Sequence, residues 1–141
     1  MFEPRDPLFA GRVRESFGRQ SAMTTIGARL VTVEPGLVAI ELPFRADLCQ
    51  QHGFLHGGIA TSIVDTACGF AALTLMAAEA AVLTVEFKVN FLAPATGERF
   101  LACGRVVRSG RQISVATGEV TAYAAGQEKI VCLMQATMST I

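Results

Sequence analysis

The chain has 141 residues, 51% of them hydrophobic, and its twelve basic and twelve acidic side chains cancel to a net charge of zero. This length fits one domain with a substantial core, and the balanced charge leaves no general field to attract nucleic acid or an anionic membrane. Because so much hydrophobic sequence leaves few polar residues to cover a lone monomer, we expect a homo-oligomer.

The cysteines and the N-terminus indicate the compartment. The four cysteines lie far apart without a Cys-x-x-Cys pair, and the N-terminus lacks the basic-then-apolar order of a signal peptide. The apolar run between Asp65 and Glu79 has thirteen residues, fewer than the roughly 20 that a membrane-spanning helix needs. We therefore expect a cytoplasmic protein that does not enter a membrane.

Residues 1–21 form the first predicted element, a helical N-terminal segment. Its charged residues are interspersed with apolar ones spaced by four, among them Val13 and Phe17, which is typical of a short amphipathic helix. The β-branched runs 30–33 and 37–42 follow, separated by a Glu-Pro-Gly turn. Proline and glycine supply the torsions of a tight turn, so these runs predict a β-hairpin.

The longest predicted helix covers residues 58–81, where small and aliphatic residues with good helix propensity dominate. Residues 83–91 then alternate between apolar and polar side chains, which is typical of a strand that buries one face. Three further strands are expected at residues 100–108, 111–123 and 130–138.

This order of elements predicts the fold class. A short helix, two strands, one long helix and four strands in a meander indicate a single α+β domain over residues 1–141, with a largely antiparallel sheet. The many small residues of the long helix would let the sheet approach closely and wrap around it.

The segment 50–58 indicates where the function lies, because it ends in His56, Gly57 and Gly58 just before the long helix. Glycines at a helix start expose backbone N–H groups at the positive end of the helix dipole, which suits a developing oxyanion. Asp65 follows in a run too apolar to solvate it. Burial tends to raise the pKa of such a carboxylate toward the range useful for proton transfer.

The pattern of an amide residue, a glycine, His-Gly-Gly and a helical aspartate resembles that of hot-dog-fold acyl-CoA thioesterases of the phenylacetate-degradation type. The pattern is met here by Gln50, Gly53, His56 to Gly58, and Asp65. A second match is the strand that breaks at Pro94, which is similar to the strand that leaves the site in this family. The resemblance covers most of the chain and implies the hot-dog fold, an antiparallel sheet wrapped around one long central helix.

The same resemblance implies roles for single residues. The backbone N–H of Gly57, helped by the side chain of Gln50, would polarise the thioester carbonyl, and Asp65 would supply the base or nucleophile. A hydroxyl residue early in the next strand, Thr84, would hold the water or the carboxylate. The usual amide residue of the family is asparagine, so Gln50 is longer by one methylene.

Helix geometry predicts that this site is shared between subunits. Gly57 and Asp65 are eight residues apart, which is about 12 Å along a helix axis. One chain cannot bring both to one carbonyl, so they would come from two antiparallel helices across a two-fold axis, giving two sites per dimer. The long strands would pair edge to edge, and a dimer of dimers is the expected larger assembly.

The predicted chemistry needs neither a metal nor another cofactor. Asp65 would activate a water as general base, or attack the carbonyl directly, and the residues leave both routes open. The leaving thiolate needs little acid assistance because thiols have a pKa near 8.5. His56 is therefore expected to orient the loop rather than to act as an acid.

Each candidate residue also has a simpler interpretation. Asp65 could be a structural carboxylate satisfied by a neighbouring hydroxyl, and Thr84 an exposed strand residue. His52 and His56 have the spacing of two metal ligands, but the glycines between them oppose a helix and no third ligand is near. For Cys49 and Cys68, the other possible nucleophiles, core packing is the favoured interpretation.

Substrate binding is predicted from three groups of residues. The backbone of Gly58 adds a further N–H at the helix start, and Phe54 and Leu55 would line an acyl tunnel with Phe70 and Leu73. The turn between Arg108 and Arg111 offers two cations for the phosphates of coenzyme A. The acyl group itself remains open, with aryl, medium-chain and long-chain groups all possible.

Two other function classes fit the sequence. A hot-dog hydratase or dehydratase would pair a histidine with an acid from the facing helix, a role that His56 and Asp65 could imitate. A non-catalytic acyl-CoA-binding module would bind the same ligand without depending on Asp65. Acyl-CoA is the expected partner in all three cases.

Overall fold

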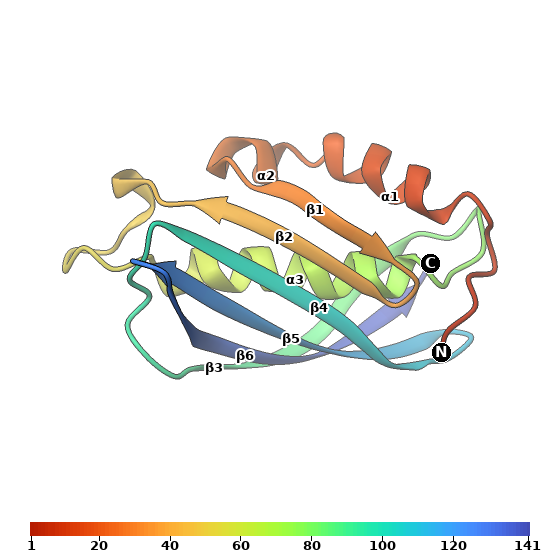
Figure 1. The fold of residues 1–141 in the computed structure, drawn as a ribbon. Helices are drawn as coiled ribbons and strands as arrows, with labels where there is room; N and C mark the ends of the chain where they lie inside the picture. Colours follow the sequence, from red (N-terminus) through yellow and green to blue (C-terminus); the bar gives the residue numbers. More distant parts are fainter.

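The computed structural model describes residues 1–141 and shows one curved antiparallel sheet wrapped around a central helix (Figure 1). This architecture confirms the predicted α+β class. In chain order the elements are α1 (Phe9–Gly18), α2 (Ser21–Ile26), β1 (Arg29–Glu34), β2 (Leu37–Pro43), a short 3-10 helix (Ala46–Leu48), α3 (Gly57–Leu73), β3 (Val82–Phe91), β4 (Arg99–Ser109), β5 (Ile113–Ala124) and β6 (Gln127–Thr140).

The strand order is β1-β2-β4-β5-β6-β3, which corrects the prediction that the last four strands form a meander. Only β4, β5 and β6 do so, whereas β3 pairs with β6 and β4 pairs with β2. The reason is the connection at residues 92–98, which is too long for a hairpin turn and carries the chain back to β2. As a result, β3 is a free edge of the sheet.

The edge strand β3 does not bury one face within a single chain, contrary to the prediction for residues 83–91. Leu83, Val85 and Phe87 are 56%, 59% and 42% exposed. A strand with unpaired backbone groups and exposed apolar side chains is a surface suited to pairing with another chain.

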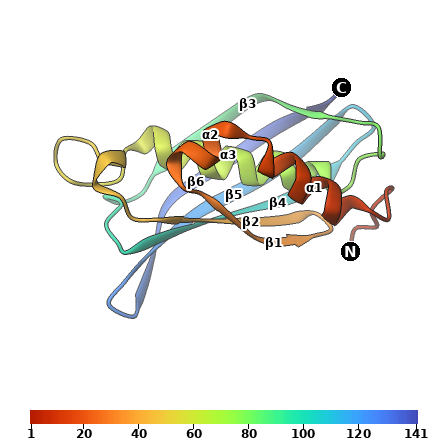
Figure 2. The same ribbon diagram turned by 90° about the horizontal axis from the view of Figure 1, so that it is seen from above.

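The helix predicted in the N-terminal segment is present as α1, and a second short helix, α2, which was not predicted, follows it. The chain leaves α1 after Gly18, and Gln20 is non-helical with a ψ of 90° before α2 begins. Gly27 ends α2 in the left-handed conformation with a φ of 78°, which glycine adopts at little steric cost. Figure 2 shows α1 and α2 above α3, beside the open edge of the sheet at β1.

The central helix ends at Leu73, eight residues before the predicted end at Ala81. Thr74 caps this end, because its hydroxyl donates to the carbonyl oxygen of Ala71 at 2.6 Å and accepts from the backbone N–H of Gly36 at 2.8 Å. Helix propensity favoured continuation, but these buried tertiary bonds stop the helix.

Arg12 of α1 covers carbonyl groups at the end of α3 and in the turn that follows it. Its guanidinium donates to five backbone carbonyl oxygens, those of Leu73, Met76, Ala77, Ala78 and Ala80. Its Nε also lies 3.2 Å from a carboxylate oxygen of Asp6. A cation at the negative end of the helix dipole is favourable, so Arg12 fastens α1 to the core.

The closest contact between α3 and the sheet is made by two sheet glycines. A Cβ atom on Gly104 of β4 would lie 2.4 Å from the carbonyl carbon of Ala67, and one on Gly118 of β5 would lie 2.5 Å from a methyl group of Val64. These two glycines are direct cross-strand partners. The predicted close approach is therefore confirmed for α3, and the sheet glycines that permit it were not anticipated.

Replacement of Gly104 by alanine should destabilise the fold, because the new methyl group would collide with helix backbone that cannot rotate away. We expect the free energy of unfolding to fall by roughly 1–3 kcal/mol or more, measured by urea denaturation. Gly11→Ala in α1 is the matched control, since a Cβ there meets no heavy atom within 4 Å. That control should be neutral or stabilising, and an equal loss in both variants would contradict the packing argument.

Candidate active site

The start of α3 presents one backbone donor that the protein does not use. His56 precedes the helix with extended torsions, and its Nδ1 accepts the N–H of Gly58 at 2.8 Å. The N–H groups of Ile59 and Ala60 donate to the carbonyl oxygen of His56, whereas the N–H of Gly57 has no acceptor. His56 therefore caps and orients the loop, and Gly57 offers the free donor at the positive helix end.

Gln50 is fixed so that its amide nitrogen is available. Its side-chain oxygen accepts the backbone N–H groups of His52 and Phe54, the latter at 3.3 Å. Its backbone N–H donates to the carbonyl oxygen of Phe54 at 2.9 Å, and Gly53 closes the loop with a φ of 82°. Because the side-chain oxygen faces the loop, the Nε2 group remains as a donor.

Gln50 and Gly57 line one cavity of about 510 Å³. Its walls are mostly apolar and include the predicted tunnel residues Phe54 and Leu55. Phe91, at the end of β3, covers Gly57 so closely that a Cβ there would lie 3.0 Å from its ring. The structure therefore brings together four of the predicted site residues, and it adds Phe91, which sequence reasoning did not single out.

Asp65 lies near the middle of α3, half-buried, and accepts a 2.8 Å hydrogen bond from the hydroxyl of Thr84. Burial raises the pKa of the Asp65 carboxyl group above its ordinary value, and the Thr84 bond lowers that pKa in part. No basic side chain forms an ion pair with this carboxylate. The predicted contact between these two residues is present.

A β-bulge in β3 turns Thr84 toward the helix. The register against β6 shifts between Thr84 and Glu86, so Val85 is an extra residue in the strand. Thr84 pairs with Met138 and Phe87 pairs with Ala136, and both partners are buried. Without the bulge, residues 84 and 87 would face opposite sides of the sheet. The sequence alternation gives no sign of this shift.

Asp65 and Thr84 line a second cavity, of about 390 Å³, between α1 and α3. Arg12 and Ser16 of α1 form part of its wall, together with the predicted acyl-tunnel residues Phe70 and Leu73. This cavity shares no lining residue with the one beside Gly57. A single chain therefore keeps the two halves of the predicted site apart.

The arginines predicted to bind phosphate lie at the opposite end of α3 from Gly57. Arg108 is exposed near the end of β4. Arg111 lines a separate cavity of about 410 Å³ with Arg5 and Glu79. Neither arginine reaches the cavities of Gly57 and Asp65.

Cys68 and Cys132 are poor candidates for the nucleophile. Burial raises the pKa of Cys68 to about 12 and that of Cys132 to about 11, so both stay protonated at neutral pH. Cys68 is fully buried beneath the sheet, as expected for core packing. No three His, Cys, Asp or Glu side chains are grouped to hold a metal ion, and no helix has the length and apolar character to cross a membrane.

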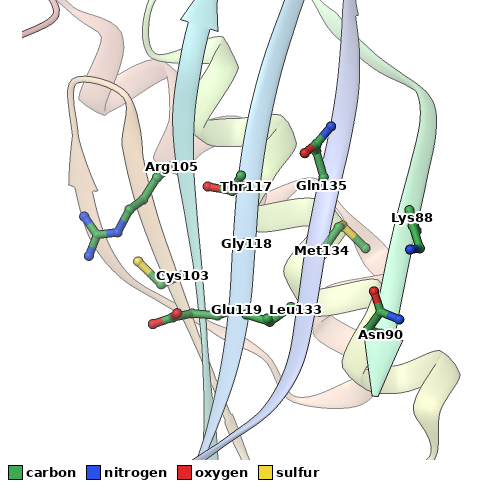
Figure 3. Close-up of a pocket in the computed structure, with 10 residues that line it drawn as sticks. All are labelled: Lys88, Asn90, Cys103, Arg105, Thr117, Gly118, Glu119, Leu133, Met134 and Gln135. Atoms are coloured by element: carbon green, nitrogen blue, oxygen red, sulfur yellow. The ribbon is translucent and has the colours of Figure 1, made fainter. Parts of the chain in front are cut away.

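A further hollow, of about 400 Å³, lies on the outer face of the sheet. Figure 3 shows Lys88 and Asn90 from β3 on one side of it and Arg105 from β4 on the other, with Glu119 and Gln135 between them. It contains neither Asp65 nor Gly57. The hollow is thus a polar surface feature, separate from the two cavities of the candidate site.

Proteins of known structure share this fold. A thioesterase family protein from Silicibacter pomeroyi is 51% identical and superimposes with a TM-score of 0.93 over 94% of this chain and 98% of that chain. The E. coli PaaI protein of the phenylacetic acid degradation operon has a TM-score of 0.85 over 94% of this chain and 93% of that chain. At 20% identity it shows the shared fold alone.

Two curated relatives add sequence similarity. A protein of Saccharolobus solfataricus, provisionally named an esterase, is 36% identical over 90 residues, which are 64% of this chain and 64% of that relative. The 1,4-dihydroxy-2-naphthoyl-CoA hydrolase of Listeria monocytogenes is 25% identical over 115 residues, or 82% of this chain and 91% of that enzyme.

A family model decides the assignment. The model described as the thioesterase superfamily matches residues 52–128, which include His56, Gly57, Asp65 and Thr84. This match covers more than half of the chain, and together with the structural neighbours it confirms the predicted hot-dog fold. The chain therefore belongs to the thioesterase superfamily.

Proposed function

We propose that the protein hydrolyses the thioester bond of an acyl-CoA to the free acid and coenzyme A. One observation carries this proposal: α3 bears an unused N–H group at Gly57 and a half-buried carboxylate at Asp65 held by Thr84. These are the two parts that acyl transfer to water needs, an oxyanion donor and a base. Family membership and the coenzyme A substrate named for the Listeria relative support the same reaction.

The active site is shared between two subunits in this proposal. Gly57 and Asp65 are eight residues apart on one rigid helix, about 12 Å along its axis. A two-fold axis would place Asp65 of one subunit opposite Gly57 and Gln50 of the other. The exposed apolar side chains and free backbone edge of β3 support a dimer that joins two sheets at this strand.

The larger assembly and the compartment are proposed on similar grounds. Two such dimers would form a tetramer, in keeping with the high hydrophobic content of the chain. All four cysteines are free thiols, which supports a location in the reducing cytoplasm.

The proposed reaction begins when the carbonyl oxygen of the thioester accepts hydrogen bonds from the backbone N–H of Gly57 and the side-chain Nε2 of Gln50. These fixed donors stabilise the negative charge that develops on this oxygen in the tetrahedral transition state. The hydrogen bond from Thr84 fixes one carboxylate oxygen of Asp65. The other oxygen takes a proton from a water molecule, and the water oxygen forms the new bond to the thioester carbonyl carbon. The carbon–sulfur bond then breaks, and the thiolate leaves without needing an acid.

Hydrolysis is favoured over the hydratase alternative by the match to the thioesterase superfamily. Nδ1 of His56 accepts the N–H of Gly58 within the same turn, so this ring nitrogen serves the helix cap. Arg108 and Arg111 are the proposed contacts for the phosphates of coenzyme A, which would extend from the reacting carbonyl to the far end of α3. Arg5 adds a second cation near Arg111, beside Glu79.

Asp65→Asn should abolish most of the hydrolysis, because an amide cannot take a proton from water. We expect kcat to fall at least about 100-fold, measured as free-thiol release from a panel of acyl-CoAs. The variant should elute from gel filtration like the wild type. Full turnover by this variant would remove Asp65 from the mechanism and favour a different base.

Gly57→Pro should remove the oxyanion donor while leaving the helix intact. Proline is well tolerated at the first helical position, and the extended torsions of His56 suit a residue before proline. Loss of one good donor should cost about 10²- to 10³-fold in kcat. Gly57→Ala is the matched control, because it adds similar bulk against Phe91 but keeps the N–H, and it should retain far more activity.

The Gly57→Pro variant also tests whether the active site is shared between two subunits. Subunits carrying Asp65→Asn and subunits carrying Gly57→Pro are each inactive alone, but a mixed dimer would contain one site with both groups intact. Random assortment should restore about one quarter of wild-type activity in co-expressed protein. No recovery, in a sample shown by mass spectrometry to contain mixed dimers, would place both groups in one subunit.

Thr84→Val should shift the pH dependence of hydrolysis. Asp65 must be ionised to act as a base, so the rate falls as the pH drops through its pKa. Removal of the Thr84 hydrogen bond, which lowers that pKa, should raise the pKa further and move the acidic limb of the kcat/KM profile to higher pH. Thr84→Ser, which keeps the hydroxyl, should leave the limb near its wild-type position. An unmoved limb in Thr84→Val would show that this bond does not tune the base.

A further inference from the structure

The edge strand β3 contacts α3 at both halves of the proposed site. The hydroxyl of Thr84 donates to Asp65 at 2.8 Å, and the ring of Phe91 lies against Gly57. The two-fold axis of the proposed dimer passes midway between Gly57 and Asp65 on α3, because it exchanges these positions between the subunits. The same axis must therefore cross β3 near the midpoint of residues 84 and 91, at residue 87 or 88.

The pleat of β3 decides how two copies of this strand can pair. Beyond the bulge at Val85 the strand is regular, with residues 86 to 91 paired one to one with β6. Residues directly opposite each other in an antiparallel pair lie on the same face of the sheet, and the face alternates with every residue. A two-fold axis through the joined sheet must therefore pass through a residue that faces its own counterpart, not between two residues.

Charge distinguishes the two possible registers. With Lys88 on the axis, two lysine side chains would lie directly opposite each other, which is unfavourable. With Phe87 on the axis, Glu86 of each subunit lies opposite Lys88 of the other. The two Phe87 rings then pair on the helix side of the sheet, where Ala136, the neighbour of Phe87 in β6, is buried. Neither Glu86 nor Lys88 forms an ion pair within its own chain.

The backbone of β3 is free to make this pairing at Phe87. The N–H of Leu92, the residue after β3, donates to the carbonyl oxygen of Val131 in β6 at 2.9 Å. Backbone groups of successive strand residues point to alternate edges, so those of Phe87, five residues earlier, point away from β6. The Phe87 side chain is 42% exposed in the single chain, which leaves apolar surface for a second copy to cover.

We propose that two subunits join β3 to β3 with Phe87 on the two-fold axis, and that Glu86 of each subunit forms an ion pair with Lys88 of the other. The proposal rests on the shared site of the proposed function, because it names the strand register that places Asp65 of one subunit opposite Gly57 of the other. A register shifted by two residues would slide one subunit along the other by about 7 Å and separate these two groups.

Disulfide formation tests the register. In Phe87→Cys, the two new cysteines would lie opposite each other with Cα atoms about 5.5 Å apart, within the range of a disulfide. In Lys88→Cys, the matched control, they would lie two residues out of register and more than about 7 Å apart. After oxidation, most of Phe87→Cys but little of Lys88→Cys should run as a covalent dimer on a non-reducing gel, above the wild-type background. Cross-linking of Lys88→Cys instead, or of neither variant, would overturn the register.

Charge reversal at the surface gives a second test. Glu86→Lys and Lys88→Glu each convert both ion pairs into like-charge pairs, and each should raise the dimer dissociation constant about fivefold or more. The double variant restores opposite charges and should return the constant to near its wild-type value. The repulsion between residues 86 and 88 of one strand is present in monomer and dimer alike, so it cancels from this constant.

The constants are measured by analytical ultracentrifugation at low salt. Lys129→Glu is the matched control, because it makes the same charge change at an exposed residue of β6 outside the pairing with β3, and it should leave the constant unchanged. Single variants that behave like the wild type would contradict the proposed ion pairs. Neither test uses turnover, so absence of thiol release from every acyl-CoA would refute the proposed function and leave the register standing.

Discussion

The contact between α3 and the paired glycines Gly104 and Gly118 is the constraint on which the rest of the structure depends. The sheet can curve around the helix only because neither glycine carries a side chain toward Ala67 and Val64. This contact fixes the position of α3 at Val64 and Ala67, on either side of Asp65. The start of the helix lies against Phe91 at the end of β3, beside the loop that holds Gln50, and Asp65 lies close to the fixed point.

Rigid placement on a single helix explains why the two halves of the site stay apart within one chain. A loop could bend to bring a base to an oxyanion donor, but a helix held by the sheet cannot. The protein gains fixed geometry for both groups and, under the proposed mechanism, needs a second subunit to complete each site. The apolar edge strand β3 lies next to both groups, since it supplies Thr84 to one and Phe91 to the other.

The sequence predicted those features that depend on local pattern. The elements, the free N–H at Gly57 and the contact between Thr84 and Asp65 follow from glycine placement, periodicity and a family motif. Features set by tertiary contacts were not predictable in the same way. The bulge at Val85 inserts a residue without disturbing the apolar-polar alternation, and the end of α3 at Leu73 depends on Thr74 and on a distant arginine. The place of β3 beside β6 depends on long-range strand pairing, since Pro94 and Gly97 mark only where the strand ends.

The role of Arg12 has a consequence for where the folding unit begins. Its guanidinium, with Asp6 beside it, completes a helix end that is more than sixty residues away in the chain. A shortened chain that starts after Arg12 would keep every strand and the whole of α3, yet it would leave several carbonyl groups without donors and one wall of the Asp65 cavity missing. The N-terminal segment is thus an integral part of the domain rather than a dispensable extension.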